Sequence, residues 1–466
     1  MKSDSLFIEQ FVDTGLGNSA YLVGSHATKQ AALIDPLRDV DRYLAAAERL
    51  SVTITHVLDT HLHADFVSGA RELAARAGAR LGASAEAKLG FDHQPLVEGD
   101  ELPLGDATLQ VLKTPGHTPE HISFLLSAAE SKTPQALFSG GALIVGGAAR
   151  TDLLGHELTV PLAQHLYHTL RHKIMTLPDE VNVYPTHGAG SFCVAPASSD
   201  RITTIGRERQ TNPLVQVHSE EEFVQRALSG LPSYPVYYRE MRPINQRGPQ
   251  VLGGVPVLKP LSPEEVHGYI ERGTAVLDVR PWQAFAEGHI PGAYSIQLDA
   301  PLITWAGWLI PFGAPLILVA GDARQREKAV RQLIRIGYDN LLGYLEGGLE
   351  AWASAGLRTA QAPTISPREL RERMRSGKEL VVLDVRQDSE WAAGHIPGAL
   401  HIENGRLPWD DLPWPTVHPI VVQCQHGARS MAGLSVLARR GYRHLMHMAG
   451  GFAQWEAEGF EVTRGE

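Results

Sequence analysis

The sequence predicts a multidomain α/β protein, and three observations lead to that fold class. The chain has 466 residues, a length that suits two to four domains. Hydrophobic residues make up 43% of it and charged residues 20%, which are values of globular domains. Short β-type runs alternate with helical patterns, and motifs of the C-terminal half occur twice. Such alternation is typical of sheets that are covered by helices.

The N-terminal half presents its elements in a regular order between residues 17 and 150. Helical periodicity covers 40–49 and 70–77, and each stretch lies between apolar runs. Apolar runs of the strand type occur at 20–23, 31–34, 56–59, 109–112, 122–126 and 136–138. We therefore expect a sheet-rich domain whose helices connect strands.

The C-terminal half contains one domain twice. Asp-x-Arg and Gly-His-Ile-Pro-Gly-Ala motifs within 276–293 return within 382–399, an offset of 106 residues (384 − 278). A Gly-Gly-x-x-x-Trp motif at 347–352 returns at 450–455, an offset of 103 (450 − 347). Because this period has the length of a small domain, it indicates two domain copies rather than a solenoid. Their first helices are expected at 263–272 and 367–376.

Cys424, one of two cysteines, lies where chemistry is expected. A β-type run at 420–423 ends at the cysteine, and a short loop with one glycine leads to Arg429 and a helical pattern. Backbone N–H groups of such a loop, and the positive end of the following helix, favour the thiolate over the thiol. The alternative is a small buried hydrophobe, which is the usual fate of a free cysteine.

These motifs resemble the rhodanese family of sulfurtransferases over about residues 258–360 and 363–464. In that family the loop cysteine accepts a sulfane sulfur as a persulfide and passes it to a nucleophile, without a cofactor. The resemblance implies that Cys424 is the nucleophile and that Arg429 stabilises the anion or orients the donor. Arg429 could instead brace the loop through an ion pair, for example with Asp384. The residues implied to cradle the persulfide are Gln425, His426, Gly427, Ala428 and Ser430.

The first copy departs from this pattern at the decisive position. Alignment of 316–333 with 420–437 places Ala320 opposite Cys424 and Gln325 opposite Arg429. An alanine has no lone pair to accept sulfur, so this copy cannot use the same mechanism. We interpret it as a spacer or docking domain.

Histidines on separate turns of the N-terminal half suggest a metal site. His61 and His63 stand at i and i+2 directly after a strand-like run, and His117 lies in a Thr-Pro-Gly-His turn. Asp65 and His187 are further candidates. Three histidines can hold a zinc or iron ion with one open position.

The N-terminal half resembles the metallo-β-lactamase superfamily over about residues 5–245, and within it the persulfide dioxygenases. The segments 138–141 and 147–152 carry the second likeness. The resemblance implies an αββα sandwich with metal at one sheet edge, held here by His61, His63 and His117. It also implies that Arg150 and Tyr184 contact glutathione. The alternatives are an ion pair for Arg150 and a core position for Tyr184.

Two departures from that family affect the metal. Phe66 stands where the His-x-His-x-Asp-His motif has its last histidine, and Gly141 stands where the family has an aspartate ligand. A two-metal hydrolase is therefore disfavoured, and so is tight binding of ferrous iron. A three-histidine zinc site and an empty site both stay open. Cys193 has no basic neighbour in sequence and is expected to be buried and inert.

Composition limits which cell compartment and which kinds of binding partner are expected. The net charge of −10 argues against nucleic acid, and the apolar runs are too short to cross a membrane. Two cysteines suit a reducing, cytoplasmic compartment. We expect domains at 1–245, 246–360 and 361–466. The expected partners are a small thiol or persulfide such as glutathione persulfide, or thiosulfate, and a homodimer stays open.

The function predicted from these features is sulfane-sulfur metabolism. Cys424 would act as a rhodanese-type sulfurtransferase, fused to a persulfide-dioxygenase-like domain with reduced or no metal activity. Three alternatives for the N-terminal domain are an active mononuclear-iron persulfide dioxygenase, a zinc-dependent hydrolase of the glyoxalase II kind, and a pseudoenzyme scaffold. One metal ion, iron or zinc, is the only cofactor expected.

Overall fold

The computed structural model of the chain describes residues 6–128, 133–193, 199–298, 301–377 and 379–465. It divides into two compact units, which are described separately: Met1–Val255 with Ile334–Gly337, and Pro256–Leu333 with Tyr338–Glu466. The three-domain division expected from sequence stays a prediction. Among the described residues, no helix combines the length and apolarity needed to span a bilayer.

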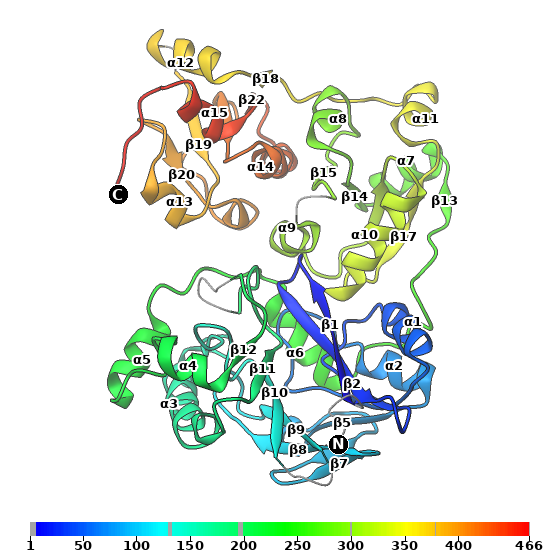
Figure 1. Ribbon diagram of the computed structural model, residues 1–466. Coiled ribbons are helices and arrows are strands. Elements are labelled where there is room, and N and C mark those ends of the chain that lie inside the picture. The colour runs from blue at the N-terminus through cyan, green and yellow to red at the C-terminus, as the bar shows by residue number, and fades with distance from the viewer. Residues whose placement is uncertain (1–5, 129–132, 194–198, 299–300, 378, 466) are drawn as a thin grey trace. The chain divides into compact units, whose positions relative to one another are not determined.

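The first unit contains two six-stranded sheets (Figure 1). The first sheet has the order β1(Leu6–Asp13), β2(Asn18–Ser25), β3(Gln30–Ile34), β4(Thr53–Leu58), β5(Arg80–Ser84), β6(Gln94–Leu96). The second sheet has the order β12(Thr203–Thr204), β11(Asn182–Pro185), β10(Pro134–Gly140), β9(Ile122–Ala128), β8(Ala107–Lys113), β7(Glu101–Leu104). The helices are α1(Asp41–Leu50), α2(Ala70–Ala77), α3(His156–His172), α4(Ile205–Thr211), α5(Glu220–Leu228) and α6(Tyr238–Arg247).

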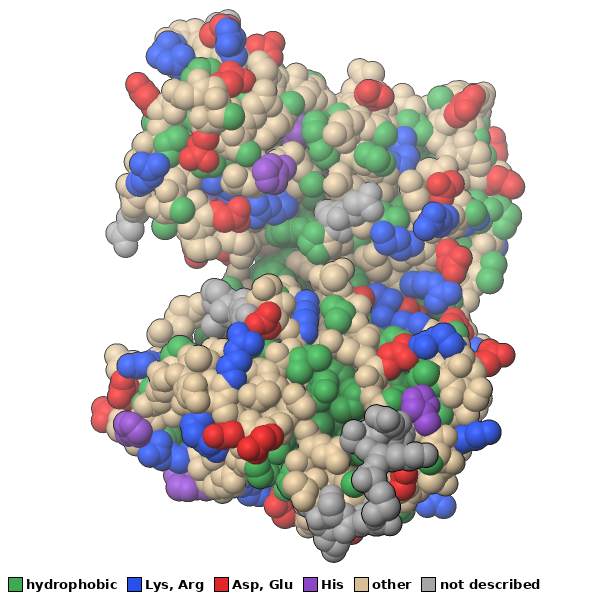
Figure 2. Space-filling view, in the orientation of Figure 1, with side chains coloured by type: hydrophobic (Ala, Val, Ile, Leu, Met, Phe, Trp, Pro, Cys, Tyr) green, Lys and Arg blue, Asp and Glu red, His purple; other side chains and the backbone are tan. Residues whose placement is uncertain are grey.

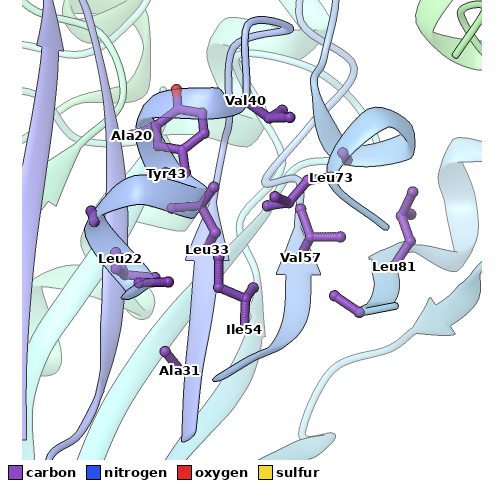
Figure 3. Close-up of a cluster of buried hydrophobic side chains, with 14 of the residues drawn as sticks. Ala20, Leu22, Ala31, Leu33, Val40, Tyr43, Ile54, Val57, Leu73 and Leu81 are labelled. Carbon is purple, nitrogen blue, oxygen red and sulfur yellow. The ribbon is translucent and has the colours of Figure 1, made fainter. Parts of the chain in front are cut away.

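Alternation along the strands builds the layers of this unit. Leu22 and Leu33 belong to a cluster with Tyr43 of α1 and Leu73 of α2 (Figure 3), so one face of the first sheet is covered by these helices. The neighbouring residues Tyr21, Val23 and Ile34 instead pack with Phe124 and Phe138 of the second sheet. Leu125, one residue beyond Phe124, packs with Leu166 and Leu170 of α3. Because successive strand residues point to opposite faces, this order gives the αββα sandwich that was predicted.

The second unit contains two five-stranded sheets whose described pairings are parallel and whose strand orders match. The first has the order β13(Pro260–Leu261), β17(Leu341–Leu345), β16(Leu316–Val319), β14(Ala275–Asp278), β15(Tyr294–Ser295). The second has the order β18(Thr364–Ile365), β22(Leu445–Met448), β21(Ile420–Gln423), β19(Val381–Asp384), β20(Leu400–His401). The identical orders confirm that one α/β domain occurs twice.

Four helices of each copy correspond in order, and the first copy has α9 where the second has a short 3-10 helix, Asn404–Arg406. Those of the first copy are α7(Pro263–Glu271), α8(Trp282–Glu287), α9(Leu302–Leu309), α10(Ala323–Arg335) and α11(Gly348–Ser354). Those of the second are α12(Pro367–Arg375), α13(Asp388–Ala393), α14(Ala428–Arg439) and α15(Gly451–Ala457). Ser262 with Glu265 and Ser366 with Glu369 form capping boxes, each with proline in the first turn. These residues fix both helix starts because they satisfy backbone N–H groups that a helix leaves free.

Acidic and basic side chains are interspersed over the face drawn in Figure 2.

Candidate functional site

Cys424 directly follows β21, a central strand of the second copy, and α14 begins four residues later at Ala428. Its sulfur accepts hydrogen bonds from the Gly427 N–H at 3.1 Å and from the Ser430 hydroxyl at 3.4 Å. The residue is 1% exposed. Donors at the start of a helix are suited to a buried sulfur anion, so the loop has the chemistry of an anion site.

The other predicted cradle residues have different surroundings. The Gln425 side chain accepts a hydrogen bond from Arg386 at 3.2 Å, and His426 is exposed. Ala428 is the first residue of α14. Gly427 and Ser430 are therefore the two cradle residues that the structure brings to the sulfur.

Gly427 is held in a conformation that only glycine adopts easily. Its φ is 108°, and a Cβ at this position would lie 3.2 Å from Trp282 and 3.3 Å from His447. Its carbonyl accepts a hydrogen bond from His447 Nε2 at 2.9 Å. The Ser430 hydroxyl lies 2.9 Å from the same carbonyl and, having one proton, donates either to it or to the Cys424 sulfur. Burial lowers the pKa of His447 to about 4, so the ring is neutral and donates through Nε2.

The repeated Gly-Gly motif closes this loop from the other side. The Phe452 N–H donates to the Cys424 carbonyl at 2.7 Å, and the Ala453 N–H donates to the Gln425 carbonyl at 3.1 Å. A Cβ on Gly451 would lie 2.2 Å from the Cys424 oxygen. The sequence repeat marked this motif, but its spacing did not reveal that it clamps the cysteine loop.

Arg429 is engaged with Glu390 of α13. The guanidinium forms two hydrogen bonds to the carboxylate, at 2.6 and 2.7 Å. Burial favours a raised pKa for Glu390, but these bonds hold it below its usual value. Asp384, the partner considered from sequence, is instead paired with Arg386 at 2.7 Å. Stabilisation of a sulfur anion by Arg429 stays a prediction.

The corresponding loop of the first copy is closed without a nucleophile. Ala320 follows β16, and the Gly321 N–H donates to Gln325 Oε1 at 3.0 Å. The Asp322 carboxylate accepts the Gln325 N–H at 2.7 Å. The Gln325 side chain and the Asp322 carboxylate therefore occupy the start of α10. In the second copy, the equivalent helix start binds the Cys424 sulfur.

The N-terminal unit brings five predicted metal-ligand candidates together in two groups. The potential ligand atoms of His61, His117 and His187 lie within 4.8 Å of one another, and so do those of His63, Asp65 and His187. All five residues are buried and follow strands β4, β8 or β11. His187, in place of the predicted His63, completes the group with His61 and His117, and 3.3 Å separates the Nε2 atoms of His61 and His187.

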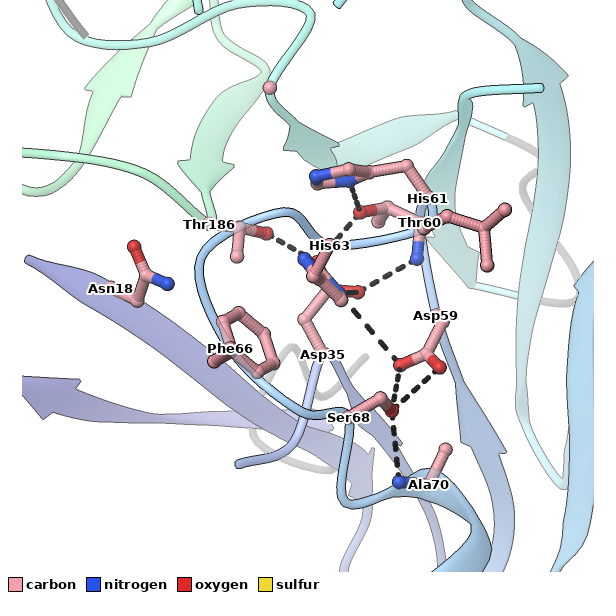
Figure 4. Close-up of polar contacts among 12 residues, drawn as sticks. Asn18, Asp35, Asp59, Thr60, His61, His63, Phe66, Ser68, Ala70 and Thr186 are labelled. Carbon is pink, nitrogen blue, oxygen red and sulfur yellow. Dashed lines mark hydrogen bonds and ion pairs between the residues drawn. The ribbon is translucent and has the colours of Figure 1, made fainter. Parts of the chain in front are cut away.

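His63 is oriented by acidic residues. Its Nε2 lies 3.2 Å from Asp35 and 3.9 Å from Asp59, and its ring stacks on Phe66 at 4.1 Å (Figure 4). Asp35 also accepts hydrogen bonds from the N–H and hydroxyl of Thr60. A carboxylate that binds one imidazole nitrogen leaves the other free to face a metal.

Three buried atoms at this centre have no hydrogen-bond partner among the described residues: His63 Nδ1, Asp65 Oδ1 and His117 Nε2. Buried polar atoms usually have partners, so unsatisfied atoms that converge from different segments call for an explanation. Burial lowers the pKa of His117 to about 3 and keeps its lone pair available. Burial opposes ionisation of Asp65, yet His187 holds its pKa at about 2. Imidazole nitrogens and one carboxylate are a donor set that fits a divalent cation.

Gly141 has no room for a side chain, so the aspartate that the resemblance leads us to expect at this position would not fit. A Cβ would lie 2.5 Å from Cδ2 of His117. The Gly141 N–H donates to His121 Nε2 at 2.9 Å, and His121 Nδ1 lies 2.8 Å from the Thr114 hydroxyl. His121 thus helps to fix the chain beside the candidate metal ligands, a role that sequence did not indicate.

Arg150 and Tyr184 both make internal contacts. Arg150 is buried, bonded twice to Asp152 at 2.6 and 2.7 Å and also bonded to two backbone carbonyls. Tyr184 is half-buried and stacks on Phe138 with 5.4 Å between ring centres. Contact of either residue with glutathione stays a prediction. Cys193 is fully buried, and burial raises the pKa of its thiol well above the usual value.

Comparisons with known proteins match this architecture. The family model described as the metallo-beta-lactamase superfamily matches residues 13–187, and the rhodanese-like domain matches 262–355 and 366–458. Persulfide dioxygenase ETHE1 of Homo sapiens is 31% identical over 212 residues, covering 44% of this chain and 74% of the relative. A hydroxyacylglutathione hydrolase of Rhodospirillum rubrum is 38% identical over 173 residues, covering 36% of this chain and 62% of the relative.

A solved structure covers more of the chain. The crystal structure of a metallo-beta-lactamase from Staphylococcus aureus subsp. aureus COL is 34% identical with a TM-score of 0.65. The match covers 73% of this chain and 99% of that one. The chain therefore belongs to the metallo-β-lactamase superfamily, as a homologue of the persulfide dioxygenases that carries two rhodanese-like domains.

Proposed function

We propose that the protein is a sulfurtransferase of sulfane-sulfur metabolism that carries sulfur as a persulfide on Cys424. The observation that carries the proposal is the position of its sulfur, 3.1 Å from the Gly427 nitrogen at the start of α14. The rhodanese-like match over 366–458, which contains this loop, supports it. The proposed donors are thiosulfate or a low-molecular-weight persulfide such as glutathione persulfide.

The reaction conserves atoms and electrons in two displacements. The Cys424 thiolate attacks the outer sulfur of the donor, the donor S–S bond breaks, and sulfite or a thiolate leaves with the electron pair. An acceptor thiolate or cyanide then attacks the outer sulfur of the persulfide, and Cys424 leaves as a thiolate. The Gly427 N–H and the Ser430 hydroxyl stabilise the anion before and after each step.

The test is Cys424→Ser in the full chain. After incubation with thiosulfate and removal of small molecules, the unmodified protein should gain the mass of one sulfur atom and release it as thiocyanate on addition of cyanide. The variant should do neither, because a serine oxygen does not carry sulfane sulfur stably. Cys193→Ser is the matched control, since this thiol is buried in the other unit. Sulfur transfer that survives Cys424→Ser would refute the proposal.

For the N-terminal domain we propose one metal ion held by His61, His117 and His187, with Asp65 and His63 as further donors. The unsatisfied atoms of His63, Asp65 and His117 support this proposal. Such an ion would supply Lewis-acid chemistry if zinc, or one-electron chemistry if iron. Because Gly141 provides no carboxylate, we expect reduced persulfide oxidation. Full activity with Asp65 completing an iron site, a glyoxalase II-like hydrolase, and a scaffold are the competing possibilities.

Metal content separates these possibilities. Elemental analysis of the purified full chain should find about one ion per chain, zinc rather than iron. His187→Ala should lower that content, because this residue belongs to both ligand groups. His168→Ala is the control, since this histidine is half-exposed on α3. One bound iron with rapid oxygen consumption would refute the reduced site, and absence of metal would favour the scaffold.

A further inference from the structure

A tryptophan of the cysteine-less copy lies on the cysteine loop of the other copy. Trp282 is the first residue of α8, and its ring centre is 4.5 Å from that of His447 on β22. Cε2 and Cζ2 of its indole lie 3.2 and 3.3 Å from where a Cβ of Gly427 would stand. Both copies belong to the same compact unit. The indole therefore covers the peptide that donates to the Cys424 sulfur.

Holding Gly427 in place holds the donor, because its N–H and its carbonyl leave the same Cα in two neighbouring peptides. The carbonyl, which belongs to the 427–428 peptide, accepts a hydrogen bond from His447 Nε2 at 2.9 Å, so the glycine is anchored on that side. Trp282 packs on the same glycine and on the same histidine ring. A glycine at φ 108° has wide conformational freedom of its own, and packing on both sides restricts it.

Trp282 is itself held against α14 by its own domain. The backbone N–H of Trp282 donates to Gln297 Oε1 at 3.2 Å. The nearby Ser295 N–H donates to the Ser435 hydroxyl on α14 at 3.1 Å, and this bond is buried. Arg439 of α14 stacks on Tyr294 with 4.3 Å to the ring centre. The contact between the copies thus extends beyond one side chain.

We propose that Trp282 is a positioning residue for sulfur transfer, through which the cysteine-less copy completes the active site of the other copy. The inference rests on the proposed transfer by Cys424. The equivalent position of the second copy, 106 residues after Trp282, is Asp388. The indole is therefore specific to the first copy and is not part of the repeated motif. The cysteine-less copy thereby takes part in the same reaction, because Trp282 sets the direction of the Gly427 N–H.

The experiment measures transfer from thiosulfate to cyanide, and alkylation of Cys424 by iodoacetamide at neutral pH, in full-length variants. Trp282→Ala should lower kcat and the alkylation rate about tenfold with little change in KM, since misdirected groups slow chemistry more than binding. Trp282→Phe should retain most of both rates, because a phenyl ring still covers Gly427. Trp409→Ala is the control, since that tryptophan is 48% exposed in the same unit.

Hydrogen exchange keeps the inference testable if Trp282→Ala destabilises the domain. In Trp282→Leu, chosen to preserve bulk, peptides that cover 424–430 should exchange faster, while those from β18 and α12 stay unchanged. Wild-type rates and exchange in the Ala and Leu variants would overturn the positioning role. That result leaves the sulfurtransferase proposal intact, since the latter fails only if Cys424→Ser retains transfer or the unmodified chain has none.

Discussion

The two rhodanese-like copies share a strand order but differ in what their equivalent loops present. In the second copy a cysteine follows β21, and Gly427 and Ser430 donate to its sulfur. In the first copy Ala320 follows β16, and the Gln325 side chain binds the loop backbone. The first copy therefore keeps the fold of the domain but lacks the cysteine that the proposed chemistry requires. The comparison teaches that the cradle depends on backbone geometry as well as on the cysteine.

Gly427→Ala is the variant with the largest expected effect, a loss of sulfur transfer that would remove the functional difference between the two copies. The methyl group must fit at φ 108° between Trp282 and His447, so we expect the loop to shift and its N–H to leave the sulfur. Loss of one such donor lowers rates by about a hundredfold, and sulfur transfer should fall by that order.

Gly441→Ala is the matched control for this variant. Gly441 also has a positive φ, 89°, but no neighbouring atom lies within 4 Å of its Cβ position. It should therefore share the backbone cost and spare the activity. Equal losses of activity in the two variants would show that general destabilisation, and not the donor, is responsible.

An intermediate effect concerns pH. Burial holds the pKa of His447 at about 4, against 6.5 for an ordinary histidine. Below pH 6.5 the unfolded chain binds a proton that the folded chain refuses, so this residue makes folding less favourable as pH falls toward 4. The loss reaches about 3 kcal/mol at most.

Heat inactivation measures this cost. The midpoint for loss of sulfur transfer, assayed at neutral pH after heating, should drop more between pH 7 and about pH 5 in the unmodified chain than in His447→Gln. The glutamine keeps an N–H donor but takes up no proton. Parallel pH dependences in both proteins would mean that other groups govern acid inactivation.

The smallest effect is expected when a cysteine is placed in the first copy, because that copy should still carry no sulfur. Ala320→Cys in a Cys424→Ser background should accumulate no persulfide. Asp322 places a carboxylate at the start of α10, where an anionic sulfur would need the helix end. Intact mass after incubation with thiosulfate is the measurement. A stable gain of one sulfur atom would show that the cysteine alone decides activity, and would remove the backbone from the comparison.

Sequence reasoning succeeded where the signal is local. The turn from β21 through Cys424 into α14 was predicted from adjacent residues, as were the helices at 263–272 and 367–376, which begin at capping boxes. The layers of the N-terminal sandwich were predicted through the family resemblance, and the alternation of buried residues confirms them.

The partners of the site residues were harder to predict because they depend on tertiary contacts. His187 joins His61 across 126 positions, and no spacing rule connects them. Glu390 binds Arg429 only because α13 lies beside the loop, and Trp282 reaches Gly427 from another copy of the domain. Histidines and carboxylates in the sequence indicated where the sites lie. Which of these residues contact one another depends on the packing of distant segments.

The burial of Cys424 has a consequence for how long the protein retains its cargo. A persulfide on an exposed side chain reacts with whatever thiol or oxidant is most abundant in solution. Cys424 is 1% exposed here; its sulfur accepts from the start of α14, and its backbone carbonyl is bound by the first turn of α15. If Cys424 carries sulfur as proposed, its residence time should be governed by which molecules are slender enough to enter the loop, so acceptor shape, more than acceptor concentration, should select the recipient of the sulfur.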